Sequence, residues 1–216
     1  MPAHVIPPGP HCLMCAHHQH PLSRPVPPLT VPPAYPHRRA TDGWDVHPAP
    51  CGNIYFVGFR DGDGWVLCER CQSRHWGLYG AAGLLLVRID VDPVLVLLQL
   101  RAGWTHGGGT WALPGGALDS HEHPVEAAVR EAWEETGIEP EHVKPKLMFS
   151  DNHGNWRYDT VIAHTSIDVG AYEANAESEA LHWVPVDNVA AYDLHPGLRH
   201  TWPELIDLVK SSLEEQ

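Results

Sequence analysis

GALDSHEHPVEAAVREAWEETGI, residues 116–138, is the stretch of sequence that decides the fold. It predicts a loop followed by a helix from about Pro124 to Thr136, because proline suits the first helical turn and Gly137 suits the position after the last turn. Small and apolar residues recur at helical spacing and predict the face that packs on the core, namely Val125, Ala128, Val129, Ala132 and Thr136.

Three carboxylates gather on another face of the same predicted helix. Glu131, Glu134 and Glu135 stand at positions i, i+3 and i+4, and a turn of about 100° per residue places all three within one arc. Like charges this close repel and cost helix stability, whereas a hard divalent cation prefers carboxylate oxygens and would offset the repulsion. The pattern predicts either a solvated acidic face or a site for a divalent cation.

The segment resembles the signature of the Nudix hydrolase family, G-x5-E-x7-R-E-U-x-E-E-x-G-U, in which U is an apolar residue. The fixed and apolar places are filled by Gly116, Glu122, Arg130, Glu131, Ala132, Glu134, Glu135, Gly137 and Ile138. The resemblance implies an α/β/α sandwich with a mixed sheet, in which this box forms a loop, a helix and a second loop. It also implies hydrolysis of a phosphoanhydride bond in a nucleoside diphosphate derivative.

The same resemblance implies a role for each residue of the box. Glu131, Glu134 and Glu135 would bind Mg²⁺ or Mn²⁺, and Glu131 would also help to deprotonate the attacking water. Arg130 would orient Glu131 through a charge-assisted hydrogen bond. Gly116 and Glu122 complete the expected metal site, Gly116 in the turn before the helix and Glu122 as an outer ligand or support.

Many members of the family take one more acidic residue from a later loop. Glu177 and Glu179, shortly before Trp183, are the candidates, and Glu177 is favoured. Each has the alternative of a plain surface role.

Strand and helix patterns surround the box and favour the α/β class. The expected strands are Asn53–Phe59, Trp65–Leu67, Gly83–Ile89, Val94–Leu100, Val143–Ser150, Arg157–Thr165 and Leu181–Val184. A short helix near Asp187–Ala191 and a last helix from Pro203 to about Leu213 are expected to follow.

The first 50 residues differ from the rest of the chain. They hold many of its prolines and a histidine cluster at His17, His18 and His20, a composition that disfavours long helices and inner strands. We therefore expect a largely disordered extension over residues 1–50 and the Nudix domain over residues 51–216.

Charge and hydropathy exclude several classes of function. A formal net charge of −13 argues against a broad basic surface for a nucleic-acid polymer, so the expected partner is a small nucleotide. The N-terminus lacks a basic segment followed by an apolar one, and charges and Pro93 interrupt the apolar stretch from Gly83 to Leu100. Neither a signal peptide nor a membrane span is expected, and the expected location is the cytoplasm.

Runs outside the box bear on the substrate. Asp61–Trp65, Trp76–Leu86, Thr110–Gly116 and Leu194–Leu198 resemble the actinobacterial MutT-type enzymes that hydrolyse 8-oxo-guanine nucleotides. The Ser-Gln-Pro-Trp-Pro-Phe-Pro run of NADH pyrophosphatases and the later proline of ADP-ribose enzymes are missing. Hydrolysis of 8-oxo-dGTP or 8-oxo-GTP to the monophosphate is favoured. The alternatives are a pyrophosphatase for ADP-ribose, NADH or a related compound, and a non-catalytic module that senses nucleotides.

Aromatic and basic residues near the predicted loops are candidates for substrate binding. Trp104, Trp111 and Trp156 can stack on a base or simply pack against the core, and Arg101 can hold a phosphate or be solvated.

Two Cys-x-x-Cys pairs, Cys12 with Cys15 and Cys68 with Cys71, have the spacing of zinc knuckles. They predict either a structural four-thiolate Zn²⁺ site or free thiols, with Cys51 or His75 as a substitute ligand.

Overall fold

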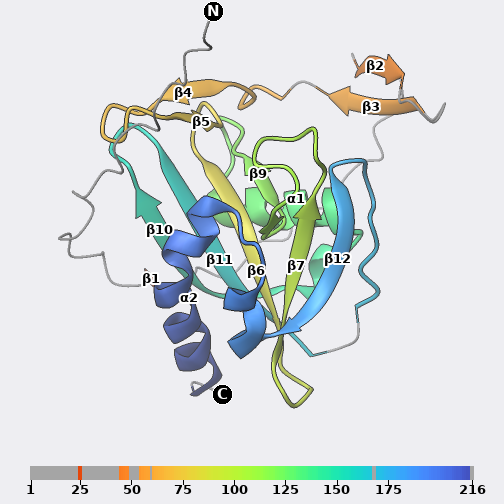
Figure 1. Ribbon diagram of the computed structural model, residues 1–216, viewed down its shortest axis with the longest axis vertical. Coiled ribbons are helices and arrows are strands. Elements are labelled where there is room, and N and C mark those ends of the chain that lie inside the picture. The colour runs from red at the N-terminus through yellow and green to blue at the C-terminus, as the bar shows by residue number, and fades with distance from the viewer. Residues whose placement is uncertain (1–23, 26–43, 49–53, 59, 167–168, 215–216) are drawn as a thin grey trace, which may run out of the picture.

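The computed structural model describes residues 24–25, 44–48, 54–58, 60–166 and 169–214. Within them a mixed sheet runs in the order β1-β10-β11-β6-β7-β12, with β8 beside β7 and β9 beside β6 (Figure 1). Its strands are β1 (Arg24–Pro25), β6 (Ala81–Arg88), β7 (Leu95–Arg101), β8 (Trp111–Ala112), β9 (Gly115–Ala117), β10 (Lys144–Asn152), β11 (Arg157–Thr165) and β12 (Ser178–Pro185). Strand β11 runs parallel to β6, and the other paired strands are antiparallel.

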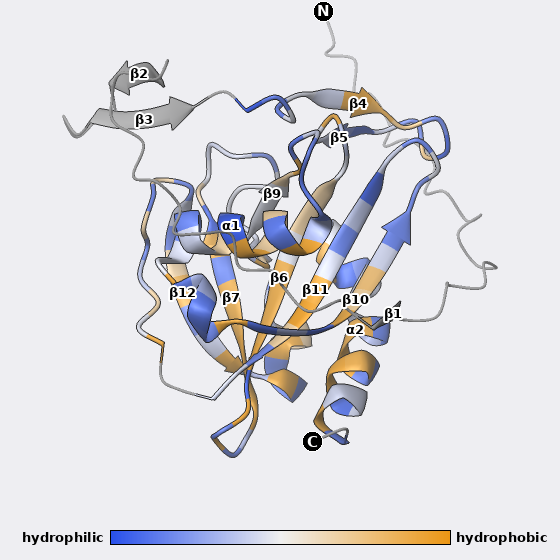
Figure 2. Cartoon of the chain, turned by 180° about the vertical axis from the view of Figure 1, so that it is seen from behind, coloured by the Kyte–Doolittle hydropathy of each residue, from blue (hydrophilic) through white to orange (hydrophobic). Residues whose placement is uncertain are grey.

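Alternate residues of β6 face opposite sides of the sheet and divide the core in two. Leu84 and Leu86 pack with the buried face of helix α1 (Pro124–Thr136). Leu85 and Val87 pack with buried residues of helix α2 (Pro196–Glu214), on the other side of the sheet. Hydrophobic residues accordingly fill the central strands in Figure 2. The predicted α/β/α sandwich is confirmed.

Helix α1 begins and ends where the sequence predicts. His123 caps its start, Pro124 occupies the first turn, and Gly137 ends it with a left-handed φ of 69°. The predicted core face is confirmed, since the five residues expected there are all buried: Val125, Ala128, Val129, Ala132 and Thr136.

The last helix is longer than predicted. It begins at Pro196, and Pro203, the predicted start, lies inside it. Leu198, Trp202, Leu205 and Val209 are buried at helical spacing, so their packing compensates for the hydrogen bond that an internal proline removes. The short helix before α2 is the 3-10 helix η2 (Val186–Ala191), and another 3-10 turn, η1 (Pro140–His142), follows α1.

Two small antiparallel sheets precede β6. One pairs β2 (Trp44–Pro48) with β3 (Ile54–Gly58), and the other pairs β4 (Trp65–Leu67) with β5 (Arg74–Trp76). Most of the predicted extension over residues 1–50 lies outside the described residues, and the β2–β3 pair spans its proposed boundary. No helix in the described part of the chain is both long and apolar enough to cross a membrane.

Candidate active site

Arg130 organises carboxylates from α1 and from the loop before it. Its side chain is 3% exposed and donates to both oxygens of Glu122 at 2.6 and 2.7 Å, to Glu131 at 2.7 Å and to Glu134 at 3.4 Å. It also donates to the carbonyl oxygen of Ala117 at 3.0 Å. Bidentate pairing to Glu122 fixes the plane of the guanidinium, and that plane in turn fixes Glu131.

Glu122 supports the site from the loop before α1. Besides pairing with Arg130, it accepts a hydrogen bond from the backbone N–H of Asp119 at 3.0 Å. These hydrogen bonds hold the loop against the helix.

Glu131 and Glu135 are buried near the start of β9, in surroundings that disfavour the charged form of each carboxyl group. Burial raises the pKa of Glu131 to about 7, against the lowering effect of Arg130. Burial raises the pKa of Glu135 to about 8, and the charges of Glu131 and Glu177 add to this rise. Glu135 accepts from the backbone N–H of Gly115 at 2.8 Å and has no ion-pair partner among the described residues.

Gly116 faces the carboxyl group of Glu131 directly. A Cβ atom at Gly116 would lie 2.6 Å from the carboxyl carbon of Glu131, closer than real Cβ contacts. The missing side chain therefore makes room for this carboxylate. Three carboxylates on one helix, two of them with a raised pKa and one facing a glycine, fit a hard divalent cation, which would favour their charged form.

An arginine outside the box also contacts it. Arg60 pairs with Glu134, and with Asp119 at 3.1 Å. The backbone N–H of Gly62 donates to Asp119 at 3.3 Å, and the backbone N–H of Ser120 donates to Asp61 at 2.9 Å. The segment 60–62 is thereby fastened to the loop before α1. The spacing of the box carries no signal for Arg60, because it lies 74 residues from Glu134 in the chain.

The two later acidic candidates occupy different places. Glu177 lies near enough to Glu135 for its charge to raise the pKa of Glu135. Burial raises the pKa of Glu177 itself, against the attraction of Arg101. Glu179 instead accepts a hydrogen bond from the N–H of Gly103 at 2.8 Å, in the glycine-rich loop. The structure therefore places Glu177 near the box. The hydrogen bond described for Glu179 leads to the glycine-rich loop instead.

Tyr158 and His195 lie near Arg101, and neither is among the site residues predicted from the sequence. Burial raises the pKa of Tyr158, whose hydroxyl lies over Gly83. Burial lowers the pKa of His195 to about 4, and the charge of Arg101 adds to this fall. No sequence signal marked Tyr158, whereas His195 lies within the Leu194–Leu198 run, whose resemblance could have pointed to it.

The candidate tryptophans differ in their surroundings. Trp104 is 69% exposed in the glycine-rich loop. Trp111 packs against His182 and Tyr192, with ring centroids 4.5 and 5.1 Å away. Trp156 stacks on His75 at 4.1 Å. Trp104 is thus the most open of the three for stacking on a ligand.

Two groups among the described residues bring ligand atoms of His, Cys or Asp within 4.8 Å of one another. One contains Asp61 together with Asp119 and His121 of the box, and the other contains Cys68, Cys71, His75 and His153. Cys12, Cys15 and Cys51 lie outside the described residues, so the four-thiolate arrangement stays a prediction.

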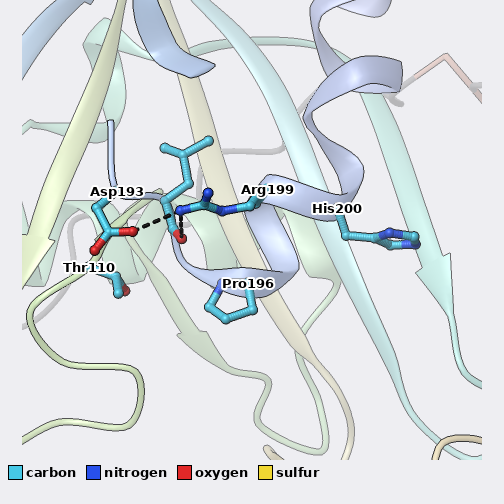
Figure 3. A pocket seen from close by; sticks show the side chains of 6 residues that line it. Thr110, Asp193, Pro196, Arg199 and His200 are labelled. Carbon is cyan, nitrogen blue, oxygen red and sulfur yellow. Dashed lines mark hydrogen bonds and ion pairs between the residues drawn. The ribbon is translucent and has the colours of Figure 1, made fainter. Parts of the chain in front are cut away.

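A surface pocket is lined by residues from outside the box. Arg199 pairs there with Asp193 at 2.8 Å and donates to the carbonyl oxygen of Leu194 at 3.4 Å (Figure 3). Thr110, Pro196 and His200 complete the lining. This pocket shares no lining residue with the carboxylate site.

Comparison with known proteins identifies the family. Residues 78–205 match the model of the NUDIX domain. The chain belongs to the Nudix hydrolase family. The family acts on small nucleotide substrates and generally uses divalent metals, in keeping with the carboxylate site.

Several Nudix relatives resemble the chain beyond the family level. A Mycobacterium tuberculosis protein named "Putative 8-oxo-dGTP diphosphatase 3" is 45% identical over 155 residues, covering 67% of this chain and 69% of that protein. A Bifidobacterium longum nucleoside triphosphate pyrophosphatase/Nudix hydrolase fusion protein is 41% identical over 164 residues, covering 71% and 32%. The predicted resemblance to 8-oxo-guanine nucleotide diphosphatases is confirmed.

Solved structures agree with the fold. The Nudix hydrolase RenU from M. smegmatis is 43% identical, with a TM-score of 0.64, covering 69% of this chain and 96% of that one. A C. elegans Ap4A hydrolase is 17% identical with a TM-score of 0.50, covering 62% and 98%, and this likeness concerns the fold alone.

Proposed function

We propose that this Nudix hydrolase cleaves a phosphoanhydride bond of 8-oxo-dGTP or 8-oxo-GTP, with Mg²⁺ or Mn²⁺, and releases the nucleoside monophosphate. The observation that carries the proposal is the carboxylate array of Glu131, Glu134 and Glu135, ordered by Arg130 and cradled by Gly116. The identity to relatives named for 8-oxo-dGTP supports the choice of nucleotide.

The box residues supply the metal ligands in this proposal. Glu131, Glu134 and Glu135 would hold the cation, with Glu177 as the additional acid, since its charge already acts on Glu135. When bound, the cation neutralises charge on the phosphates and promotes ionisation of water. Glu122 stays with Arg130 and positions the others, because both of its oxygens are engaged by that guanidinium.

Arg60 would yield its place on Glu134 when the cation binds. Arg60 pairs with both Glu134 and Asp119, so it can keep its second partner while releasing the first. An arginine near the phosphates would also attract the substrate.

The reaction we propose is a single displacement by water. The water oxygen bonds to phosphorus, and the bridging P–O bond breaks with its electron pair on the departing phosphate oxygen. One water proton passes to the carboxylate of Glu131 and then to solvent. A triphosphate would give the monophosphate and pyrophosphate, and a diphosphate would give the monophosphate and phosphate.

Residues next to the box would contact the nucleotide. Arg101 would hold a phosphate, because its charge acts on Glu177 and Tyr158 beside the carboxylates. Trp104 would stack on the base from the glycine-rich loop, since most of its ring is exposed.

A substrate panel tests the proposal. Purified protein with Mg²⁺ is expected to hydrolyse 8-oxo-dGTP with a higher kcat/KM than dGTP, ADP-ribose, NADH or Ap4A. The Glu134→Gln variant should lose this turnover, whereas Glu141→Gln, whose carboxylate is 79% exposed, should keep it. Preference for ADP-ribose or NADH would overturn the substrate, and nucleotide binding without turnover in the wild type would indicate a sensing module.

A further inference from the structure

A second cluster of metal-ligating side chains lies apart from the box. Cys68, Cys71 and His75 come from the β4–β5 hairpin, and His153 comes from the loop between β10 and β11. One ligand atom from each lies within 4.8 Å of the other three. In Figure 1 this hairpin lies over the ends of β10 and β11, so the cluster sits where the two segments meet.

The turn of the hairpin brings the two thiols together. The N–H of Cys71 donates to Sγ of Cys68 at 3.4 Å, and the N–H of Gln72 donates to the carbonyl oxygen of Cys68 at 2.9 Å. Gln72 then adopts a left-handed φ of 59°, which reverses the chain into β5. Nε2 of His75 lies 3.2 Å from Sγ of Cys71. Three ligands are therefore in place within one eight-residue segment.

His153 supplies the independent observation that points to a ligand. Its Nε2 lies 3.1 Å from the carboxylate of Asp151, so Nε2 carries the proton and donates it. Its Nδ1 is buried, accepts no hydrogen bond from an N–H or O–H group of the described residues, and has the thiols of Cys68 and Cys71 as its polar neighbours. A histidine whose one nitrogen donates to a carboxylate and whose other nitrogen presents a lone pair is the usual arrangement in zinc sites.

We propose that Cys68, Cys71, His75 and His153 bind one structural Zn²⁺. Two thiolates and two imidazoles form a tetrahedral donor set that Zn²⁺ prefers and that Mg²⁺ does not. Bond lengths of about 2.3 Å to sulfur and about 2.0 Å to nitrogen put tetrahedral ligands roughly 3.3–3.8 Å apart. The cluster reaches that spacing by small side-chain movements. Four protein ligands leave no open position, so the ion is structural.

The ion would strengthen a junction that otherwise rests on a few hydrogen bonds and on the ring contacts of His75 with Trp156 and His153. Arg70 donates to the carbonyl oxygen of Asn152 at 2.8 Å, and the backbone N–H of Glu69 donates to Oδ1 of Asn155 at 3.1 Å. Exposed hydrogen bonds of this kind contribute little to stability. The segment 60–62 that contacts the box continues directly into this hairpin, so the ion would also steady that segment.

The chain offers a matched control for the test. Cys12 and Cys15 form the other Cys-x-x-Cys pair, with the same spacing. The proposal requires the double variant Cys12→Ser/Cys15→Ser to keep its zinc, whereas the four-thiolate alternative requires it to lose the ion.

The experiment measures zinc in the full chain. Wild type and Cys12→Ser/Cys15→Ser, purified with zinc present and dialysed against metal-free buffer, should each retain one Zn²⁺ per chain by mass spectrometry. His153→Ala and Cys68→Ser/Cys71→Ser should retain less than a tenth of that amount. X-ray absorption of the wild type should show two sulfur and two nitrogen neighbours, a readout that does not depend on whether the variants fold.

Three results of the zinc measurements would overturn the proposal. They are a wild type without stoichiometric zinc, a shell of four sulfur atoms, and loss of zinc from Cys12→Ser/Cys15→Ser. A disulfide between Cys68 and Cys71 in protein purified without oxygen would overturn it as well. None of these results bears on hydrolysis at the box, because the two sites share no residue.

Discussion

Replacement of Gly116 by alanine places a steric probe beside one carboxylate. The added Cβ would lie 2.6 Å from the carboxyl carbon and from Oε1 of Glu131, whereas ordinary contact begins at 3.4 Å. The difference, 3.4 minus 2.6, requires the carboxylate to move by 0.8 Å. Gly116 has no positive φ, so alanine costs its backbone no strain.

The expected effect falls on turnover and spares the fold. A displacement of about 1 Å in a positioned catalytic group can cost about 100-fold in rate, which is about 2.7 kcal/mol. The atom that moves is the far end of a flexible side chain, so the free energy of unfolding should change by less than about 1 kcal/mol. We expect Gly116→Ala to lower kcat about 100-fold.

The assay is steady-state phosphate or pyrophosphate release with Mg²⁺, together with urea unfolding of the same samples. Gly170→Ala is the control, because a Cβ there meets nothing within 4 Å and its φ is not positive. The control should keep wild-type kcat and stability. Full kcat in Gly116→Ala would refute the placement of Glu131 in the catalytic machinery, and so would an equal loss in the control.

Three other perturbations have defined outcomes. Glu134→Gln should lower kcat by about 100-fold or more, since a bound metal contributes several kcal/mol to catalysis, and Glu141→Gln should not; equal turnover in both would contradict the assignment. Arg130→Lys should lower the free energy of unfolding by roughly 2 kcal/mol, because lysine cannot pair with both oxygens of Glu122, and urea unfolding would show it. Burial lowers the pKa of His164 to about 4, below the value of about 6.5 in the unfolded chain. Because the unfolded chain then takes up the proton first, the free energy of unfolding should fall as the pH drops from about 6.5 toward 4. Between pH 7 and pH 5, the free energy of unfolding of the wild type should fall by about 2 kcal/mol more than that of His164→Gln, as urea unfolding would measure. Equal decreases in both proteins would count against a neutral buried histidine.

Much of the fold could be predicted because its signals are local. The helix of the box carries its own start, end and core face, and the apolar runs that form β6, β7, β10 and β11 are long enough to stand out. The start of α2 was missed because Pro203 suits a first turn, while the packing of Leu198 and Trp202 that extends the helix is tertiary. Strands β8 and β9 are two and three residues long, too short for a periodic signal.

The residues of the candidate sites also divide into those that local sequence predicts and those that only the folded chain brings together. Glu131, Glu134 and Glu135 share one helix, so their spacing predicts that they lie together. Arg60, Tyr158 and His153 reach their partners only through the folded chain, and nothing in their immediate sequence marks them. The Cys-x-x-Cys pattern at Cys68 was visible, but the histidine that joins it lies 85 residues further on.

The most direct test of the central proposal is an assay of 8-oxo-dGTP hydrolysis by the full chain, in which the released pyrophosphate is measured. Protein treated with EDTA should be inactive, and Mg²⁺ alone should restore turnover to 8-oxo-dGMP. Undiminished turnover in EDTA, or no turnover of any nucleotide with Mg²⁺ in wild type that binds the nucleotide, would contradict a metal-dependent hydrolase built on Glu131, Glu134 and Glu135.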